Sequence, residues 1–194
     1  MKAMILAAGY GTRLKPLTDN KPKALVEIKG IPLIEIVIKR LIHFGFTDII
    51  INLHHFADQL SEFIKLKKNF GINIQFSDES DLLLDTGGGI KKASWFFKDG
   101  KPFLIYNVDI LSDIDLGNLY NFHLKNQSLV TLAVSDRDTI RKLGFDSKGL
   151  LCEWVNLSSG ERKISRQAEG PLQLLAYSGT HVIDPAIRSE ERRV

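Results

Sequence analysis

The chain has 194 residues, 44% of them hydrophobic and 25% charged, which is an ordinary balance for a globular protein of one domain. Its 26 basic and 23 acidic residues are interspersed and sum to +3, so we expect neither nucleic acid nor a membrane as a partner. The only cysteine, Cys152, excludes an internal disulfide and a cysteine-cluster metal site, and we expect it to be buried in a protein of a reducing, cytoplasmic compartment.

In chain order, short apolar runs alternate with segments of helical periodicity. The runs that predict strands are residues 3–8, 47–53, 72–79, 102–110, 129–135, 150–155 and 174–183. The segments that predict helices are residues 31–45, 56–71, 88–97 and 116–125. This order predicts an α/β fold with a Rossmann-like, mainly parallel sheet flanked by helices, to which the later strands add antiparallel or peripheral members. No segment is long enough to span a bilayer.

A glycine-rich loop follows the first predicted strand. Gly9 and Gly11 permit unusual backbone angles and close approach of a ligand, and Arg13 adds a cation that can bind a phosphate in a bidentate way. An isolated G-x-G is more often a simple turn. Leu14 stands where a dinucleotide-binding fingerprint needs a small residue, and Arg13 stands where a P-loop needs Ser or Thr, so both of those motifs are rejected.

Polar residues also follow other predicted strands, where ligands bind in open α/β sheets. Glu79 and the Thr86–Gly89 segment come after the third strand, and Asp109 follows the fourth, in a position suited to a magnesium carboxylate. His54 and His55 are adjacent on an extended segment and point opposite ways, so we expect them to be loop residues rather than metal ligands.

The segment GYGTRLKPLTDNKPKALVEIKGIPLI, residues 9–34, resembles the signature of the sugar-phosphate nucleotidyltransferases, also called nucleotide-sugar pyrophosphorylases. LLLDTGGGIKKA and LIYNVDI resemble the nucleoside-binding and metal-binding segments of that family. The Thr-Gly-Gly-Gly at residues 86–89 is most similar to the N-acetylmuramate-1-phosphate uridylyltransferases, with the mannose-1-phosphate guanylyltransferases nearby. The resemblance runs to about Pro185 and fades between Ser135 and Gln173.

The resemblance implies a role for each matching residue. The nucleotide-binding residues would be Ala7, Ala8, Gly9, Gly11, Thr12, Arg13, Glu79, Thr86, Gly87 and Gly88. The sugar-binding residues would be Asn107, Ser178 and Gly179, although Tyr177 stands where many hexose enzymes carry asparagine. The catalytic residues would be Arg13, Lys23 and Asp109, and Asp109 would bind Mg²⁺. Lys23 would lie between the two phosphates that react.

The implied reaction is a Mg²⁺-dependent transfer of a nucleoside monophosphate from UTP or GTP to a sugar 1-phosphate, with release of pyrophosphate. The sugar 1-phosphate is already ionised at neutral pH, so the reaction needs no general base. Alternatives are a cytidylyltransferase that uses phosphocholine or a sugar alcohol phosphate, and a nucleotide-sugar sensor without turnover. Leu14 argues against a nicotinamide-dependent oxidoreductase.

The end of the chain departs from the pattern of the family. Members continue into a segment with a second metal-binding aspartate, and no such motif follows residue 183. We therefore expect one nucleotidyltransferase domain over residues 1–194 that is shortened at its carboxyl end. The sequence predicts no particular oligomeric state. Asp184 is a candidate to replace the missing carboxylate.

Overall fold

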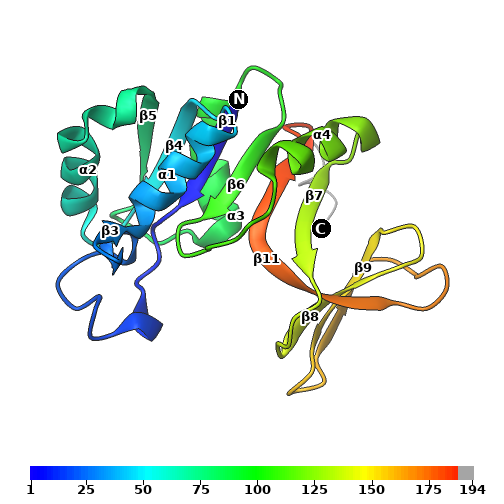
Figure 1. Cartoon of the computed structure of the whole chain (residues 1–194). Helices are drawn as coiled ribbons and strands as arrows, with labels where there is room; N and C mark the ends of the chain where they lie inside the picture. Colours follow the sequence, from blue (N-terminus) through cyan, green and yellow to red (C-terminus); the bar gives the residue numbers. More distant parts are fainter. Residues whose placement is uncertain (188–194) are drawn as a thin grey trace. The chain divides into compact units, whose positions relative to one another are not determined.

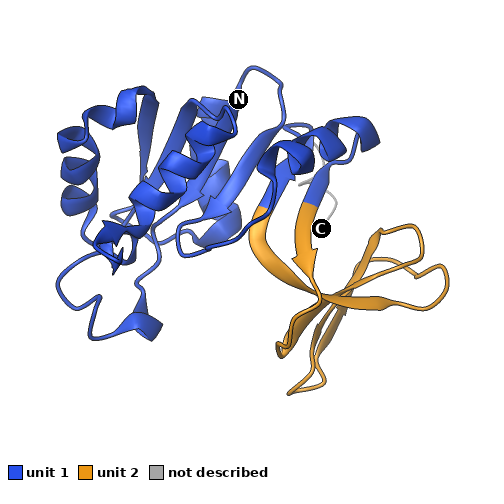
Figure 2. Cartoon of the chain, in the orientation of Figure 1, with its two compact units in different colours: residues 1–131, 181–194 blue, residues 132–180 orange. Residues whose placement is uncertain are grey.

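The structure is a computed structural model, and it describes residues 1–187. The chain divides into two compact units (Figure 2). Unit 1 contains Met1–Thr131 and the described residues from His181 onward, and unit 2 contains Leu132–Thr180. A single domain can contain two such units, so the prediction of one domain over residues 1–194 stays a prediction. The expectation about the charged carboxyl-terminal residues 188–194 lies outside the described residues.

Unit 1 is built on a parallel sheet. Its strands β6 (Phe103–Asn107), β1 (Lys2–Leu6), β4 (Asp48–Leu53) and β5 (Asn73–Asp78) lie in that order, and each neighbouring pair is parallel. Isoleucine-rich runs such as that of β4 favour this arrangement because β-branched side chains pack well on a pleated surface that is covered on both sides. The predicted α/β fold is confirmed.

Helical segments connect these strands (Figure 1). The α-helices are α1 (Leu33–His43), α2 (Ala57–Leu66), α3 (Asp85–Lys92) and α4 (Leu116–Asn126). Short 3-10 turns cover Thr12–Leu14, Lys23–Leu25, Lys68–Gly71 and Ala93–Phe97, and a small hairpin joins β2 (Glu27–Ile28) to β3 (Ile31–Pro32). Within residues 1–187, none of the helices combines the length and the apolar character that a membrane crossing requires.

The core has two layers because successive side chains of a strand point to opposite faces of the sheet. In β1, Ala3 and Ile5 pack in one cluster with α1, α2 and α4, whereas Met4 packs in the other with the aromatic turn Ala93–Phe97. One face of α1 is apolar, and its side chains are buried except that of Ile42, which is partly buried. Glu35 is also buried in α1, where it pairs with Lys39 and Lys67.

The strand order contains one reversal of direction. The chain moves outward from β1 to β4 and β5, and then returns to place β6 on the other side of β1. The reversal therefore lies between β1 and β6. In folds of this class, ligands bind outside the carboxyl ends of the strands at such a point.

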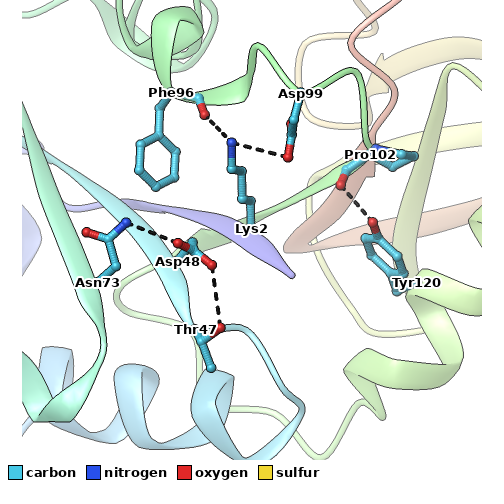
Figure 3. A network of polar contacts seen from close by, with 8 residues as sticks. All are labelled: Lys2, Thr47, Asp48, Asn73, Phe96, Asp99, Pro102 and Tyr120. Atoms are coloured by element: carbon cyan, nitrogen blue, oxygen red, sulfur yellow. Dashed lines mark hydrogen bonds and ion pairs between the residues drawn. The ribbon is translucent and has the colours of Figure 1, made fainter.

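The amino ends of the same strands carry paired polar groups (Figure 3). The Lys2 ammonium donates to the Phe96 carbonyl at 2.6 Å and pairs with Asp99 at 3.2 Å. The Asn73 amide donates to Asp48 at 3.0 Å, between the first residues of β5 and β4. These contacts attach the strands to the loops that precede them.

Unit 2 is formed by antiparallel strands. They are β8 (Arg141–Phe145), β9 (Leu151–Asn156), β10 (Arg162–Ile164), most of β7 (Val130–Ser135) and the first part of β11 (Gln173–Ile183). β8 pairs with both β9 and β11, and β10 pairs with β9. Cys152 is buried in β9, as predicted. β8 and β10 were not among the predicted strands, because their sequences RKLGF and RKI lack an apolar run.

Candidate active site

An open pocket of about 560 Å³ lies at the carboxyl ends of β1, β4 and β6 in unit 1. Most of the residues that sequence analysis assigned to the nucleotide, the sugar or the reaction line this pocket, namely Ala8, Gly9, Gly11, Thr12, Arg13, Lys23, Thr86, Asn107 and Asp109. Ala7, Glu79, Gly87 and Gly88 do not line it. Ser178 and Gly179 belong to unit 2, on β11.

The glycine-rich loop folds back against the segment that carries Lys23. Gly11 has a left-handed backbone with φ of +67°, and a Cβ atom there would come within 2.9 Å of Thr18 Cγ2 and 3.1 Å of Lys23 Cβ. The Thr18 hydroxyl donates to the Gly11 carbonyl at 2.9 Å and holds this fold. Gly11 is therefore needed both for its conformation and for its contact with the lysine segment.

Lys23 and Asp109 form an ion pair at the pocket. Their Nζ and Oδ2 atoms are 2.6 Å apart, and the side chains are 19% and 41% exposed. Pro22 precedes the 3-10 turn Lys23–Leu25 with an extended backbone, and Asp109 stands in the turn that follows β6. The chain thus brings a cation and a carboxylate from distant segments to one point of the pocket.

Behind the loop, a buried amide links three strand ends. The Asn52 Oδ1 atom, at the end of β4, accepts from the backbone N–H groups of Ala7 at 2.7 Å and Ala8 at 3.3 Å. The Asn52 Nδ2 atom donates to Glu79 Oε1 at 2.9 Å, and Glu79 Oε2 accepts from the Leu84 N–H at 3.3 Å. Asn52 and Glu79 are 3% and 0% exposed, so water does not compete for these bonds.

This network engages groups of Ala7, Ala8 and Glu79, which sequence analysis assigned to the nucleotide. The two alanine amides already donate to a protein acceptor, and both carboxylate oxygens of Glu79 already accept from protein donors. These groups are therefore not presented to the pocket in this structure. Sequence reasoning missed Asn52, although an amide side chain within the apolar run IIINL is the signal that marks it.

Helix α3 begins three residues earlier than predicted, at Asp85 rather than at Gly88. Thr86 and Gly87 therefore lie in its first turn rather than before the helix, and of these two only Thr86 lines the pocket. Gly89 is buried, and a Cβ atom there would stand 2.7 Å from Glu79 Oε1. At least one glycine of this run is thus needed for close packing against the Glu79 carboxylate.

Two histidines, His54 and His55, lie beside the glycine-rich loop, and each contacts Tyr10 rather than a shared metal site. His54 Nδ1 lies 2.7 Å from the Glu79 carbonyl, so it must carry the hydrogen, and Nε2 then accepts from the Tyr10 hydroxyl at 3.0 Å when the ring is neutral. His55 packs against the Tyr10 ring. Among the described residues, no group of three or more histidine, cysteine or carboxylate side chains is arranged to hold a metal ion.

The remaining candidates have local roles. Asp115 caps α4 by accepting from the Asn118 N–H at 2.8 Å. Asp184 accepts from the Ala186 N–H at 2.8 Å and closes a turn. In unit 2, Gly179 has a left-handed backbone, and burial raises the pKa of the Tyr177 hydroxyl well above its usual value.

Comparison with known proteins supports the resemblance to the nucleotidyltransferases. A family model described as nucleotidyl transferase matches residues 2–166. Mannose-1-phosphate guanyltransferase of Gibberella zeae is 38% identical over 74% of this chain and 40% of its own length. N-acetylmuramate alpha-1-phosphate uridylyltransferase of Caulobacter vibrioides is 31% identical over 97% of this chain and 77% of its own length. The chain spans about half the length of most curated relatives it matches.

Solved structures share the fold. HddC from Yersinia pseudotuberculosis, solved in complex with GMP-PN, superposes with a TM-score of 0.76 over 96% of this chain and 77% of that one, at 24% identity. At that identity the likeness is evidence for the fold alone. The family match covers most of the chain, from the glycine-rich loop through Asp109 and beyond. The resemblance drawn from the glycine-rich loop is confirmed, and the chain belongs to the nucleotidyl transferase family.

Proposed function

We infer that this chain transfers a nucleoside monophosphate from a nucleoside triphosphate to a sugar 1-phosphate and releases pyrophosphate. The observation that carries this proposal is the meeting of the glycine-rich loop, Lys23 and Asp109 in one pocket at the reversal of strand order. A transfer between two polyanions needs cations at the reacting centre, and Lys23 and Arg13 provide them.

Each of these residues has a role that follows from its charge and place. Arg13, exposed in the turn after the loop, would bind the pyrophosphate that leaves. Lys23 would hold the α-phosphate and the attacking sugar phosphate in line, which lowers the barrier by orientation and by charge neutralisation. No side chain has to remove a proton, because the attacking phosphate oxygen is already ionised at neutral pH.

The residues present fit a magnesium ion that arrives with the triphosphate. Asp109 is a partly exposed carboxylate in the pocket, and the described residues offer no cluster that would hold the ion without phosphate. Mg²⁺ commonly binds through one or two carboxylates, water and substrate phosphates. When bound, it would neutralise charge on the phosphates. Asp109 would hold it, and the ammonium of Lys23 would then be available to the substrates.

Our best choice of substrates is UTP with N-acetylmuramate 1-phosphate, and the alternative is GTP with mannose 1-phosphate. The Thr86–Gly89 run favours the first, and the names of the curated relatives include both activities. A cytoplasmic location fits such substrates. The second class of function, a nucleotide-sugar sensor, would bind nucleotides without turnover. The Lys23–Asp109 pair in the pocket favours the enzyme.

The test is a measurement of pyrophosphate release. UTP, GTP, CTP and dTTP would each be combined with mannose 1-phosphate, glucose 1-phosphate and N-acetylmuramate 1-phosphate, with Mg²⁺ or with EDTA. We expect release with at least one pair, dependent on Mg²⁺. A second arm uses the chain extended by a family-like carboxyl-terminal segment that supplies the second aspartate, and we expect faster turnover there. Binding of a nucleotide without release by either form would favour the sensor and contradict the enzyme.

A further inference from the structure

The side chain of Asn52 joins the backbone at residues 7–8 to the side chain of Glu79. It lies at the end of β4, and β4 lies between β1 and β5 in the sheet. On one side it accepts from the Ala7 and Ala8 amides, and on the other it donates to Glu79. A carboxamide is suited to this place because it offers an acceptor and a donor within a single planar group.

The donors and acceptors of this network fix the orientation of the Asn52 carboxamide. The two alanine amides are donors, so they require the Asn52 oxygen, and the Glu79 carboxylate is an acceptor, so it requires the Asn52 nitrogen. Flipping the carboxamide would set donors against donors and acceptor against acceptor. Glu79 in turn accepts from the Leu84 N–H and packs against Gly89, which connects the network to the start of helix α3 and hence to Thr86 in the pocket.

We propose that Asn52 is a positioning residue that couples the glycine-rich loop to the segment Glu79–Thr86, so that the two walls of the pocket adopt their binding geometry together. This inference rests on the proposed function, because it assigns the two walls to one nucleoside triphosphate. Asn52 lines the pocket itself, but its polar atoms face the protein. It therefore acts through the backbone of Ala7 and Ala8 and through Glu79.

A charge-conserving exchange of the two partners tests this role. Asn52→Asp alone sets a second carboxylate against Glu79. Glu79→Gln alone leaves a single amide oxygen for two donors, the Asn52 nitrogen and the Leu84 N–H, so one of these bonds is lost whichever way the amide turns. Each single variant therefore breaks the network at one point. In the double variant the new carboxylate at position 52 still accepts from the alanine amides and also from the new amide at position 79. The oxygen of that amide still accepts from the Leu84 N–H. The double variant therefore restores every bond of the network, and only the bond between positions 52 and 79 has its polarity reversed.

Two readouts separate positioning from simple stabilisation. The first is amide hydrogen exchange of Ala7 and Ala8 in the free protein, followed by NMR. The second is the affinity for UTP and for GTP, together with KM and kcat for the preferred pair. We expect each single variant to accelerate exchange at both alanines and to raise Kd and KM about tenfold or more, with a smaller change in kcat. The double variant should return both quantities to within about threefold of the unchanged chain.

The matched control lies at the other end of the same two strands. Asn73 donates to Asp48 at 3.0 Å, so Asn73→Asp also sets two carboxylates side by side, and Asn73→Asp with Asp48→Asn exchanges the partners in the same way. Both groups are on the exposed amino edge (Figure 3). We expect these variants to leave exchange at Ala7 and Ala8 and nucleotide affinity unchanged.

The outcomes separate this inference from the proposed function. Normal exchange and affinity in the single variants, or failure of the double variant to recover either, would overturn the role of Asn52. An equal response of the Asn73 variants would show that the effect is general destabilisation, and would overturn it as well. If the unchanged chain binds neither UTP nor GTP, the proposed function fails together with the coupling. The exchange rates would then still decide whether Asn52 holds the loop.

Discussion

The two edges of the parallel sheet in unit 1 are built from the same strands but use polar side chains in opposite ways. At the amino edge, Lys2, Asp48 and Asn73 are strand residues that neighbour one another in register and pair with partners at an accessible surface. At the carboxyl edge, Asn52 and Glu79 are almost fully buried, and their partners include backbone amides of loops. The pocket at the amino edge, lined by Lys2, Asp48 and Asp99 among others, has a volume of about 270 Å³, whereas the pocket at the carboxyl edge has a volume of about 560 Å³.

This difference indicates that the side chains at the two edges of one sheet contribute differently to function and to stability. At the amino edge an exposed pair such as Lys2–Asp99 is screened by water and contributes little more than attachment of a loop. At the carboxyl edge, buried bonds fix the backbone of the loops, and the charged groups Lys23 and Asp109 stand at the pocket. Matched substitutions at the two edges should therefore give opposite results in activity and in stability.

The largest contrast is expected between two lysines that each pair with an aspartate. Lys23→Ala should lower turnover by about two orders of magnitude or more, because one preorganised charge at a reacting centre is worth that much. It should leave the free energy of unfolding within about 1 kcal/mol, since Asp109 is 41% exposed and can be hydrated. Triphosphate affinity should fall less than turnover. Steady-state kinetics and urea unfolding measure both effects.

Lys2→Ala is the control for that contrast. It removes the contacts to the Phe96 carbonyl and to Asp99, and we expect a loss of about 1 kcal/mol in unfolding free energy with turnover within about twofold of normal. A Lys23→Ala protein with normal turnover would make Lys23 a surface residue and remove it from the chemistry.

The second contrast concerns glycines with left-handed backbones at the two edges. Gly11 and Gly45 both have positive φ, so alanine should cost about 1–2 kcal/mol in unfolding free energy at either position. Only at Gly11 would the new Cβ crowd Thr18 and Lys23, whereas at Gly45 its nearest neighbour is the Met1 side chain at 3.6 Å. We expect Gly11→Ala to lower kcat/KM by tens of fold and Gly45→Ala to leave it unchanged. Equal kinetic losses in the two proteins would count against a special position for Gly11.

The third contrast is within helix α3, at the carboxyl edge. Gly89→Ala would push a Cβ against the Glu79 carboxylate, so we expect a loss of about 1–3 kcal/mol in unfolding free energy and a weaker affinity for triphosphate. Gly87 has open space around it, and Gly87→Ala should raise the unfolding free energy by about 0.5–1 kcal/mol through helix propensity. Thermal unfolding of the two variants gives the comparison directly. Stabilisation by both substitutions would mean that the network tolerates displacement of Glu79.

Much of unit 1 could be predicted from the sequence because most of its strands are apolar runs. Those at β1, β4 and β6 are almost continuously apolar, as strands covered on both faces need to be, and β5 lies where predicted although it contains more polar residues. The glycine-rich loop, Lys23 and Asp109 could be selected as candidates because their residue types suit phosphate and magnesium. Their meeting in one pocket follows from strand order and could not be read from their spacing.

The rest depended on partners that lie far apart in the sequence. Glu79 looks like an exposed acid in SDESD, and only the folded structure reveals its bond with Asn52, whose register partner in β5 is Ser77. The start of α3 was placed too late because glycines are poor helix formers, and their local propensity was outweighed by packing against Glu79. In unit 2, β8 has no apolar run, and it is ordered by pairing with β9 and β11.

The smallest expected effect concerns the charge of Asp99 at the amino edge. Burial raises the pKa of Asp99, but the hydrogen bond and the charge of Lys2 lower it, and the net pKa lies below its ordinary value. The unfolded chain therefore binds this proton more tightly than the folded chain. The stabilisation is complete above the unfolded pKa, near pH 4, and is lost as the pH falls through the folded pKa.

Asp99→Asn should accordingly lower the unfolding free energy by less than about 1 kcal/mol at pH 7, because the carboxylate is 36% exposed. The difference from the unchanged chain should shrink towards pH 2, where the carboxylate of the unchanged chain is also neutral. Urea unfolding at pH 7, 4 and 2 measures this, and turnover at pH 7 should stay normal because the pair lies at the edge away from the pocket. A difference that is the same at every pH would show that Asp99 contributes through packing and not through its charge, and a loss of turnover would mean that the two edges are not independent.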